Sequence, residues 1–310
     1  MVALATGWEV SMDLRAYLHI APEVDQALSA GRPVLALSTT DFARCLSGPE
    51  GLVLAHRVEE IVRTCGAVPA PVAVLNGALT VGLSHSEWQQ VCSGEMGKAS
   101  RRDLPVLLAG GGSGAATAAA SMLAACLAGI RVFSAGAIGG VSARGVHMDV
   151  SADLQEIRKT PVAVVCAGIK CGCSIPLTLE YLETMGVTVL GAGTNRFPGF
   201  LTTEGPELEY PAQSPHQLAR AARIKWDIGL SGGLLYCTRP DKALAAPVYE
   251  QAQRNAMDEA DRQGICGSAR TPFLLKNILE SSEDARTVYT QAVLASARAG
   301  AEIAVEYAQL

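Results

Sequence analysis

Short apolar runs alternate with longer segments whose apolar residues recur about every three or four positions. Apolar runs bounded by glycine or proline are typical of buried strands, and the longer periodic segments are typical of helices. The expected strands are 33–37, 71–75, 105–109, 130–135, 161–167 and 187–190; the expected helices are 52–65, 115–128, 177–185, 216–226, 246–263 and 285–310, with a short helix capped by Ser86. This alternation predicts an α/β domain with helices on both faces of a mixed sheet.

No internal repeat, low-complexity tract or change of composition divides the chain. Residues 1–310 are therefore expected to form a single α/β domain, with a short variable N-terminal extension at about residues 1–20. The segment 191–215 is rich in glycine, proline, threonine and acidic residues. A long loop of this kind in a compact domain is more often functional than structural.

Composition narrows the range of partners and compartments. Of the 310 residues, 49% are hydrophobic, the net charge is −5, and the basic residues are scattered. This argues against nucleic acid or an anionic membrane as a partner. Residues 1–20 carry several charges and do not resemble a signal peptide, and every long apolar stretch is broken by glycines or helix caps. A soluble, cytoplasmic protein is expected.

The nine cysteines lie mostly in apolar or loop segments. Reduced, buried thiols in a cytoplasmic protein explain them better than a disulfide framework does. Cys171-Gly-Cys173 has no second pair of cysteines or histidines at the spacing of a zinc site, so zinc is not expected.

A glycine-rich segment, Gly110–Gly114, precedes the most apolar expected helix. Free backbone amides and a helix dipole attract anions, so this segment resembles a phosphate-binding loop. A tight turn from a strand into a helix explains the same glycines. The spacing matches neither the P-loop nor the dinucleotide fingerprint.

Three cations and a carboxylate lie at residues 98–103, before the expected strand 105–109. Solvated surface is the usual place for such side chains. Lys98 is nevertheless suited to neutralise a phosphate. Arg101, Arg102 and Asp103 are expected to form structural pairs.

Asp149-Val-Ser-Ala-Asp153 brings two carboxylates and a hydroxyl together in a short segment. Ser151 is expected to cap a helix. That cap does not explain Asp149, whereas the role of oxygen ligand to a partly hydrated Mg²⁺ or Mn²⁺ does. His147 is either a second ligand or a polar loop residue.

Lys170 ends the apolar run 161–169. Because ligands of parallel sheets bind where strands end, its amine is expected in a ligand cleft, the alternative being a solvated loop lysine. Partial burial there is expected to lower the pKa of the amine and make the neutral nucleophile available. A nucleophilic lysine near a helix start and carboxylates suits a phosphorylated sugar that is attacked at its carbonyl carbon.

Taken together, these segments resemble the pseudouridine-5'-phosphate glycosidase family, also called the indigoidine synthase A-like family, from about Pro33 to Tyr307. The matching segments are Ser100–Pro105, Leu127–Ile130, Ile138–Val141, Asp149–Gln155, Val164–Lys170, Glu180–Thr184, Gly232–Leu234 and Thr271–Leu275. So many ordered matches over most of the chain make the resemblance specific.

The resemblance implies a three-layer α/β/α sandwich with a mixed sheet, a homotrimer, and a divalent metal, Mn²⁺ or else Mg²⁺. It also implies chemistry at C1 of ribose 5-phosphate, held as an imine on a lysine. The positions that match the family's functional residues are Lys170 and Asp153 for catalysis, Lys98, Thr117, Ala118, Ser151, Ala152 and Asp153 for substrate binding, and Asp149 for the metal.

The chain departs from the family pattern where the base would bind. The family's proton-donating glutamate is replaced by Ser38, with Asp41 three residues further on, and the family's histidine after Gly-Gly-Val is Ser142. The asparagine pair that helps to hold uracil corresponds to Thr290 and Gln291. In addition, Lys-Asn of the family's glycine loop becomes Gly112-Ser113.

These departures favour C-ribosylation of a non-uracil aglycone, an aromatic or heterocyclic carbon nucleophile, by ribose 5-phosphate through a lysine imine. One alternative is a catabolic pseudouridine-5'-phosphate glycosidase that yields uracil and ribose 5-phosphate. A second alternative is an inactive relative that binds sugar phosphates. Retention of Lys170 counts against the second alternative, because binding alone does not require that amine.

Overall fold

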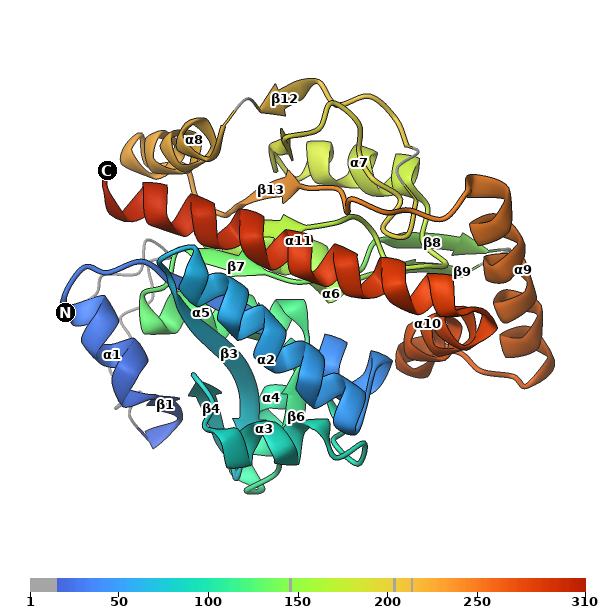
Figure 1. Cartoon of the computed structure of the whole chain (residues 1–310), viewed down its shortest axis with the longest axis horizontal. Helices are drawn as coiled ribbons and strands as arrows, with labels where there is room; N and C mark the ends of the chain where they lie inside the picture. Colours follow the sequence, from blue (N-terminus) through green and yellow to red (C-terminus); the bar gives the residue numbers. More distant parts are fainter. Residues whose placement is uncertain (1–15, 145–146, 203–204, 213) are drawn as a thin grey trace.

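The computed structural model describes residues 16–144, 147–202, 205–212 and 214–310. One mixed sheet crosses the molecule in the order β1-β4-β3-β2-β7-β10-β13-β11-β12, while β6 pairs with β3 and β5 pairs with β6 (Figure 1). The strands are β1 (Leu18–Ile20), β2 (Val34–Ser38), β3 (Val68–Leu75), β4 (Ala78–Val81), β5 (Lys98–Ala99), β6 (Gly114–Ala116), β7 (Val132–Ser134), β10 (Ala163–Cys166), β11 (Val189–Ala192), β12 (Tyr210–Ala212) and β13 (Leu234–Cys237).

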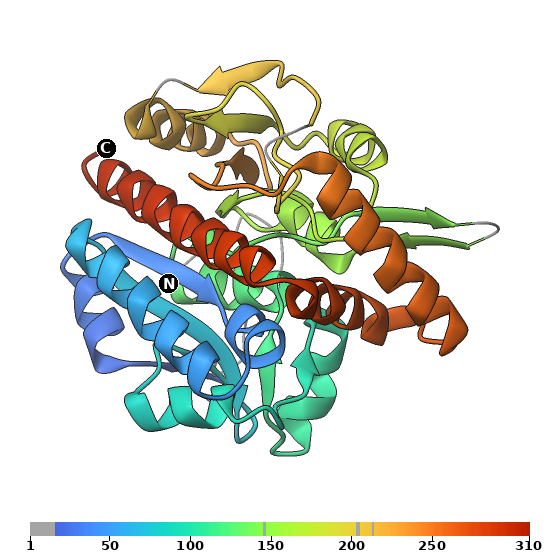
Figure 2. The same cartoon turned by 45° about the vertical axis from the view of Figure 1, so that its right-hand side comes forward.

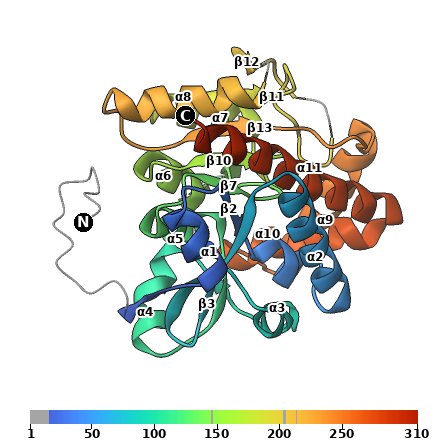
Figure 3. The ribbon, with the colours of Figure 1, turned by 60° about the vertical axis from the view of Figure 1, so that its left-hand side comes forward.

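Helices cover both faces of this sheet. They are α1 (Pro22–Ser29), α2 (Pro49–Thr64), α3 (His85–Cys92), α4 (Leu104–Ala109), α5 (Ala118–Ala128), α6 (Ala152–Lys159), α7 (Ile175–Thr184), α8 (Pro215–Asp227), α9 (Ala246–Arg262), α10 (Arg270–Ser281) and α11 (Glu283–Ala308). Figure 3 shows α1, α5 and α6 on one side of the central strands, and α2 and α11 on the other. The three-layer α/β/α architecture expected from the sequence is confirmed.

The layers follow from the alternation of side chains along buried strands. In β10, Ala163 and Val165 join the core under α2, α8 and α11, whereas Val164 and Cys166 join the core under α5, α6 and α7. A parallel strand covered on both faces is apolar at nearly every position, and β2 and β10 are buried throughout, with Ser38 at the end of β2 as a polar exception. The apolar runs of the sequence were therefore a reliable sign of central strands.

The apolar helix α5 is packed by its neighbours on most sides, as its composition predicts, and ends at Gly129, whose φ of 86° suits glycine. It begins at Ala118, later than expected, because Gly114–Ala116 pairs with β3 as a strand. Thr117 caps it, accepting a hydrogen bond from the N–H of Ala120. The glycine-rich segment therefore does not open the helix.

Three other local expectations were wrong. The run 105–109 lies in helix α4, where Pro105 occupies the first turn, a position that needs no N–H donor. Helix α3 is capped by Ser84 instead of Ser86, because Ser84 forms a reciprocal capping box with Glu87. Helix α10 was not expected.

The parallel strands β2, β7 and β10 are neighbours in the sheet, so their carboxyl ends meet at one edge. Near this edge a separate hairpin, β8 (Val141–Arg144) and β9 (His147–Val150), extends from the body at the end where α9 lies (Figure 2). The first fifteen residues of the expected N-terminal extension lie outside the described residues. No helix in the described part of the chain combines the length and apolarity needed to cross a membrane.

Candidate functional site

Lys170 lies just beyond β10, at the edge where the three parallel strands end. Its backbone N–H donates to the carbonyl of Ile138 at 2.8 Å, and the N–H of Ile138 donates to the carbonyl of Gly168 at 3.1 Å. These bonds join the loop after β10 to the loop after β7. They fix the backbone from which the amine of Lys170 extends.

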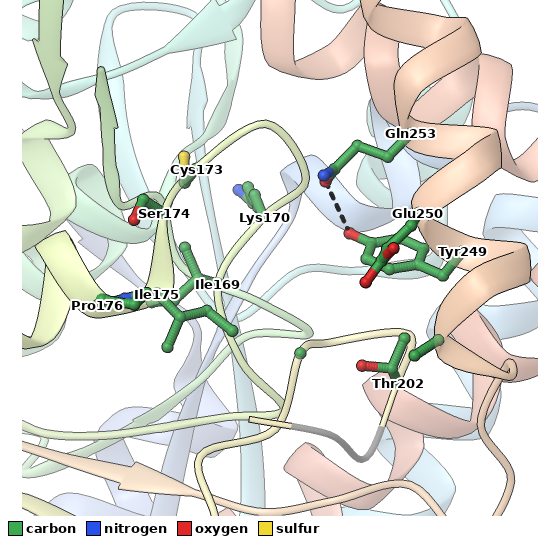
Figure 4. Close-up of a pocket in the computed structure, with 12 residues that line it drawn as sticks. Ile169, Lys170, Cys173, Ser174, Ile175, Pro176, Thr202, Tyr249, Glu250 and Gln253 are labelled. Carbon is green, nitrogen blue, oxygen red and sulfur yellow. Dashed lines mark hydrogen bonds between the residues drawn. The ribbon is translucent and has the colours of Figure 1, made fainter. Parts of the chain in front are cut away.

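A hollow of about 260 Å³ opens beside this lysine. Its lining residues include Lys170, Cys173, Ser174, Thr202, Tyr249, Glu250 and Gln253. Figure 4 shows the three α9 residues facing, across the hollow, the loop that carries Lys170 and Cys173. The side-chain oxygen of Gln253 accepts hydrogen bonds from the N–H of Gly172 at 3.0 Å and from the hydroxyl of Tyr249 at 3.3 Å.

Asp153 is a buried carboxylate that ties three segments together. One oxygen accepts the N–H of Ala119 at 2.9 Å, and the other accepts the N–H of Gly139 at 2.8 Å. Any side chain at position 139 would collide with Ser151, so the backbone can approach only as glycine. Ser151 caps α6, as the sequence predicts, accepting the N–H of Asp153 at 3.2 Å.

Asp41 is the second buried carboxyl group near Lys170, with 2% of its surface exposed. It follows β2, in the π-helical turn Asp41–Cys45. One of its oxygens accepts the N–H of Gly136 at 3.1 Å, and the other accepts the hydroxyl of Tyr289 at 3.3 Å. Asp41 thus spans from β2 to the loop after β7 and to α11.

Lys170 and these carboxyl groups act on one another electrostatically. Burial disfavours the ammonium form of Lys170, but the negative charges of Asp153 and Asp41 outweigh burial and raise the pKa of the amine. Burial raises the pKa of Asp41, although the charge of Lys170 opposes this shift. The expectation that burial would lower the pKa of Lys170 was therefore wrong, because the sequence did not reveal two compensating acids.

Lys98 lies on β5, next to the N-terminus of α5. Burial and the positive charge of Lys170 both lower the pKa of Lys98. The hydroxyl of Thr117 donates to Ser100 at 3.3 Å, which joins the two segments. Two cations near the helix start at Thr117 and Ala118 form a suitable environment for a phosphate, while the N–H of Thr117 itself donates to the carbonyl of Ala99 at 2.9 Å.

The other polar residues of this region have structural partners. Arg101 pairs with the buried carboxylate of Glu156. Asp103 accepts the N–H of Ser100 at 2.9 Å, and Arg102 lies 3.3 Å from Asp103. The expectation of structural pairing at these positions is confirmed.

The glycine-rich segment packs against the turn between β3 and β4. The N–H of Gly77 donates to the carbonyl of Gly112 at 2.9 Å, and the N–H of Asn76 donates to the hydroxyl of Ser113 at 2.9 Å. These contacts favour the structural explanation of the glycines as a tight turn. The anion-binding amides of this region belong to the start of α5.

Asp149 is exposed on β9, opposite Ser142 of β8. Burial raises the pKa of the Cys173 thiol and the charge of Asp149 adds to this shift, so the two side chains act on one another electrostatically. Within the described ranges, no three His, Cys, Asp or Glu side chains come together as a metal site. The side chain of His147 lies outside the described residues.

Ser38 and the pair Thr290 and Gln291 are not among the residues that line the hollow beside Lys170. The hydroxyl of Ser38 is buried, lies 3.0 Å from that of Thr40 and donates to the carbonyl of Ala116 at 3.3 Å. Thr290 and Gln291 line a different cavity, between α2 and α11. Their assignment to the base-binding region stays a prediction, and the adjacent Tyr289 is the α11 residue that donates a hydrogen bond to Asp41.

Sequence reasoning also missed Tyr249, Glu250 and Gln253. They lie on an ordinary amphipathic helix, and their spacing carries no sign of a ligand. Only the packing of α9 and α10 at the end of the sheet brings them opposite Lys170.

Comparison with known proteins gives a consistent result. The family model described as indigoidine synthase A like protein matches residues 23–306. A pseudouridine-5'-phosphate glycosidase from Caldanaerobacter subterraneus subsp. tengcongensis is 44% identical over 95% of this chain and 98% of its own. A pseudouridine-5'-phosphate glycosidase from Hahella chejuensis is 41% identical over 95% of this chain and 99% of its own.

Two solved structures resemble the whole fold. The prealnumycin C-glycosynthase AlnA, in complex with ribulose 5-phosphate, has a TM-score of 0.85 at 34% identity, over 94% of this chain and 97% of its own. An indigoidine synthase A-like protein from Thermotoga maritima has a TM-score of 0.85 at 26% identity, over the same shares. The chain is thus similar both to glycosidases and to a C-glycosynthase.

The raised pKa of Lys170 predicts how its amine reacts with pH. Only the neutral amine undergoes reductive methylation, so removing a carboxylate that raises the pKa must shift the rate profile to lower pH. We expect Asp153→Asn to move the midpoint for Lys170 down by about one unit or more. Mass spectrometry of the peptide that contains Lys170 measures the rate. Asp25→Asn, on the surface of α1, is the matched control, and an unchanged or higher midpoint in Asp153→Asn contradicts this view of the site.

Proposed function

The chain belongs to the indigoidine synthase A-like family, and from this we propose that it is an enzyme of C-glycosidic bonds, acting as a pseudouridine-5'-phosphate glycosidase. In this reaction the bond between C1 of the sugar phosphate and a base carbon is broken. The observation that supports it most is the amine of Lys170, held at a hollow by two buried carboxyl groups. A lysine in such a position is suited to covalent attack on carbon.

The sugar phosphate binds, in this proposal, with its phosphate near Lys98 and the first amides of α5. The neighbouring cation Lys170 adds to the attraction while it is still protonated. Ala118 contributes a helix-terminal amide, Thr117 caps α5, and Ser151 and Ala152 hold the start of α6, which positions Asp153. This arrangement directs the sugar carbon towards Lys170.

The ammonium of Lys170 first gives up a proton to solvent. The neutral amine then attacks C1 as the bond from C1 to the ring oxygen breaks, a second nitrogen proton passes to that oxygen, and C1 is held as an imine when the base departs. Asp153 accepts two backbone N–H bonds, so its carboxylate is fixed in place. It compensates the positive charge on the nitrogen both before attack and in the protonated imine. Electrostatic stabilisation by a group that is already in position is usually a large contribution to catalysis.

C-ribosylation of a non-uracil aglycone is the second candidate. The names of the relatives support cleavage of pseudouridine 5'-phosphate better than this synthesis. Two observations favour synthesis: Ser38 stands where the family has its glutamate, and the fold resembles that of AlnA. Both candidates share the imine on Lys170 and differ in the direction of the reaction and in the aglycone.

We also propose that Asp149 binds a divalent cation. Its single exposed carboxylate does not suit a metal caged by protein alone, but it suits Mn²⁺ or Mg²⁺, which retain water ligands. Such an ion would supply positive charge near Cys173. The part played by this chain is to hold Asp149 on β9.

The imine gives the first test. After incubation with ribose 5-phosphate and borohydride, we expect a reduced pentose-phosphate adduct on the peptide that contains Lys170, detected by mass spectrometry. The same enzyme should release uracil from pseudouridine 5'-phosphate, measured by chromatography. Lys170→Ala should lose both activities, because it removes the nucleophile.

Absence of the adduct in the unaltered protein contradicts the proposed chemistry. An adduct without release of uracil rejects the glycosidase and leaves C-ribosylation. In that case, coupling of ribose 5-phosphate to other carbon nucleophiles becomes the assay.

The phosphate site gives a second prediction. Lys98→Ala should raise the ribose 5-phosphate concentration that gives half-maximal adduct by about tenfold or more, since a charge-assisted contact is lost. The adduct yield at saturation should change little, because Lys170 is intact. The control sugar is ribose without phosphate: its weaker reaction should be the same in Lys98→Ala and the unaltered protein. Equal half-maximal concentrations for the phosphorylated sugar would show that Lys98 does not bind the phosphate.

The metal proposal gives a third prediction. Exhaustive chelation should abolish release of uracil, and Mn²⁺ should restore it. Asp149→Ala should bind Mn²⁺ more weakly, measured by electron paramagnetic resonance of the free ion, independently of activity. Undiminished Mn²⁺ binding by Asp149→Ala places the ion elsewhere, and full activity after chelation excludes a required metal.

A further inference from the structure

Release of a base carbon requires a proton donor, and the chain lacks the family's glutamate at Ser38. A serine hydroxyl stays protonated near neutral pH and is a poor proton donor. In this fold it is also buried and occupied by hydrogen bonds to Thr40 and Ala116. The donor must therefore be another group close to Lys170.

Three carboxyl groups lie in this region. Asp153 accepts a backbone N–H bond on each oxygen and serves as the carboxylate that compensates the charge of Lys170. Glu250 is exposed and forms an ion pair with Arg254 at 3.6 Å, on the side of the hollow away from the buried carboxyl groups. Asp41 is the remaining candidate.

We propose that Asp41, held between Tyr289 and Gly136 beside Lys170, is the catalytic proton donor in place of the glutamate missing at Ser38. This inference rests on the proposed function and deepens it. Since C1 of the sugar would be bonded directly to the nitrogen of Lys170, a carboxyl group beside that nitrogen also lies beside C1. The carboxyl ends of β2 and β10, separated only by β7, bring the two side chains together.

The surroundings of Asp41 suit a group that alternates between acid and base. Burial raises its pKa and so favours the protonated donor, while Lys170 stabilises the carboxylate left after transfer. The other titratable groups nearby are Asp153, Tyr289 and Cys45. Burial raises the pKa of the Cys45 thiol to about 12 and that of the Tyr289 hydroxyl well above its usual value, so neither competes as a base near neutral pH.

The step starts from the adduct in which the nitrogen of Lys170 is already bonded to C1. The nitrogen lone pair forms the C1=N bond as the bond from C1 to the base carbon breaks. The electron pair of that bond moves to the base carbon, which takes the proton of Asp41. The products are a protonated imine, the free base and the carboxylate of Asp41; in the reverse direction this carboxylate removes the proton from the carbon nucleophile.

Asp41→Asn separates proton donation from imine formation. The amide oxygen can still accept the N–H of Gly136, and the hydroxyl of Tyr289 can still donate to the backbone carbonyl of Asp41 at 3.2 Å, but the amide cannot supply the proton. We expect release of uracil from pseudouridine 5'-phosphate to fall by about 100-fold or more. The borohydride adduct of ribose 5-phosphate on Lys170 should persist, and Asp25→Asn should match the unaltered protein in both assays.

A second variant tests whether an acid is what was lost. Ser38→Glu in the Asp41→Asn background restores a carboxyl group at the family position, and we expect it to recover release of uracil by about tenfold or more over Asp41→Asn alone. Release by Asp41→Asn within threefold of the unaltered rate, about the size of a non-specific effect, overturns the proposal. So does loss of the adduct in Asp41→Asn, since the loss of uracil release would then follow from the missing imine and not from a missing proton donor. Failure of the unaltered protein to form any adduct instead rejects the proposed function.

Discussion

A buried lysine amine keeps its positive charge only where negative charge lies close by. Lys170 has that compensation in Asp153 and Asp41, which come from segments far apart in the sequence. Without them, burial would favour the neutral amine, and with them the pKa of the amine is raised. The rest of the site meets this requirement. The two carboxyl groups are buried, and each accepts at least one backbone N–H bond. Each also links the loop after β7 to another element.

The sheet order makes this arrangement possible. Because β2, β7 and β10 are parallel neighbours, the segments that follow them converge at one edge, and each delivers one part of the site. The helices of both layers then complete it. The start of α5 and Lys98 supply positive charge for a phosphate, whereas α9 and α11 bring Gln253 and Tyr289 from the opposite layer.

Much of this could be predicted from the sequence, where the signal was local. Buried strands and the cap at Ser151 depend on neighbouring residues, and Lys170 and Asp153 lie in segments that match a family. The run 105–109 was ambiguous because a short apolar run carries no periodicity that separates strand from helix. The direction of the pKa shift of Lys170 and the roles of Tyr289 and Gln253 could not be predicted, because they depend on contacts between distant segments.

The central claim is that Lys170 becomes covalently bonded to C1 of an opened sugar phosphate while Asp153 and Asp41 balance its charge. The most direct measurement is a crystal structure of the protein after reaction with ribose 5-phosphate and borohydride. We expect continuous electron density from the nitrogen of Lys170 to C1 of an open-chain sugar, with the phosphate near Lys98. A closed sugar ring beside an unmodified Lys170, or a sugar bonded to a different lysine, would contradict it.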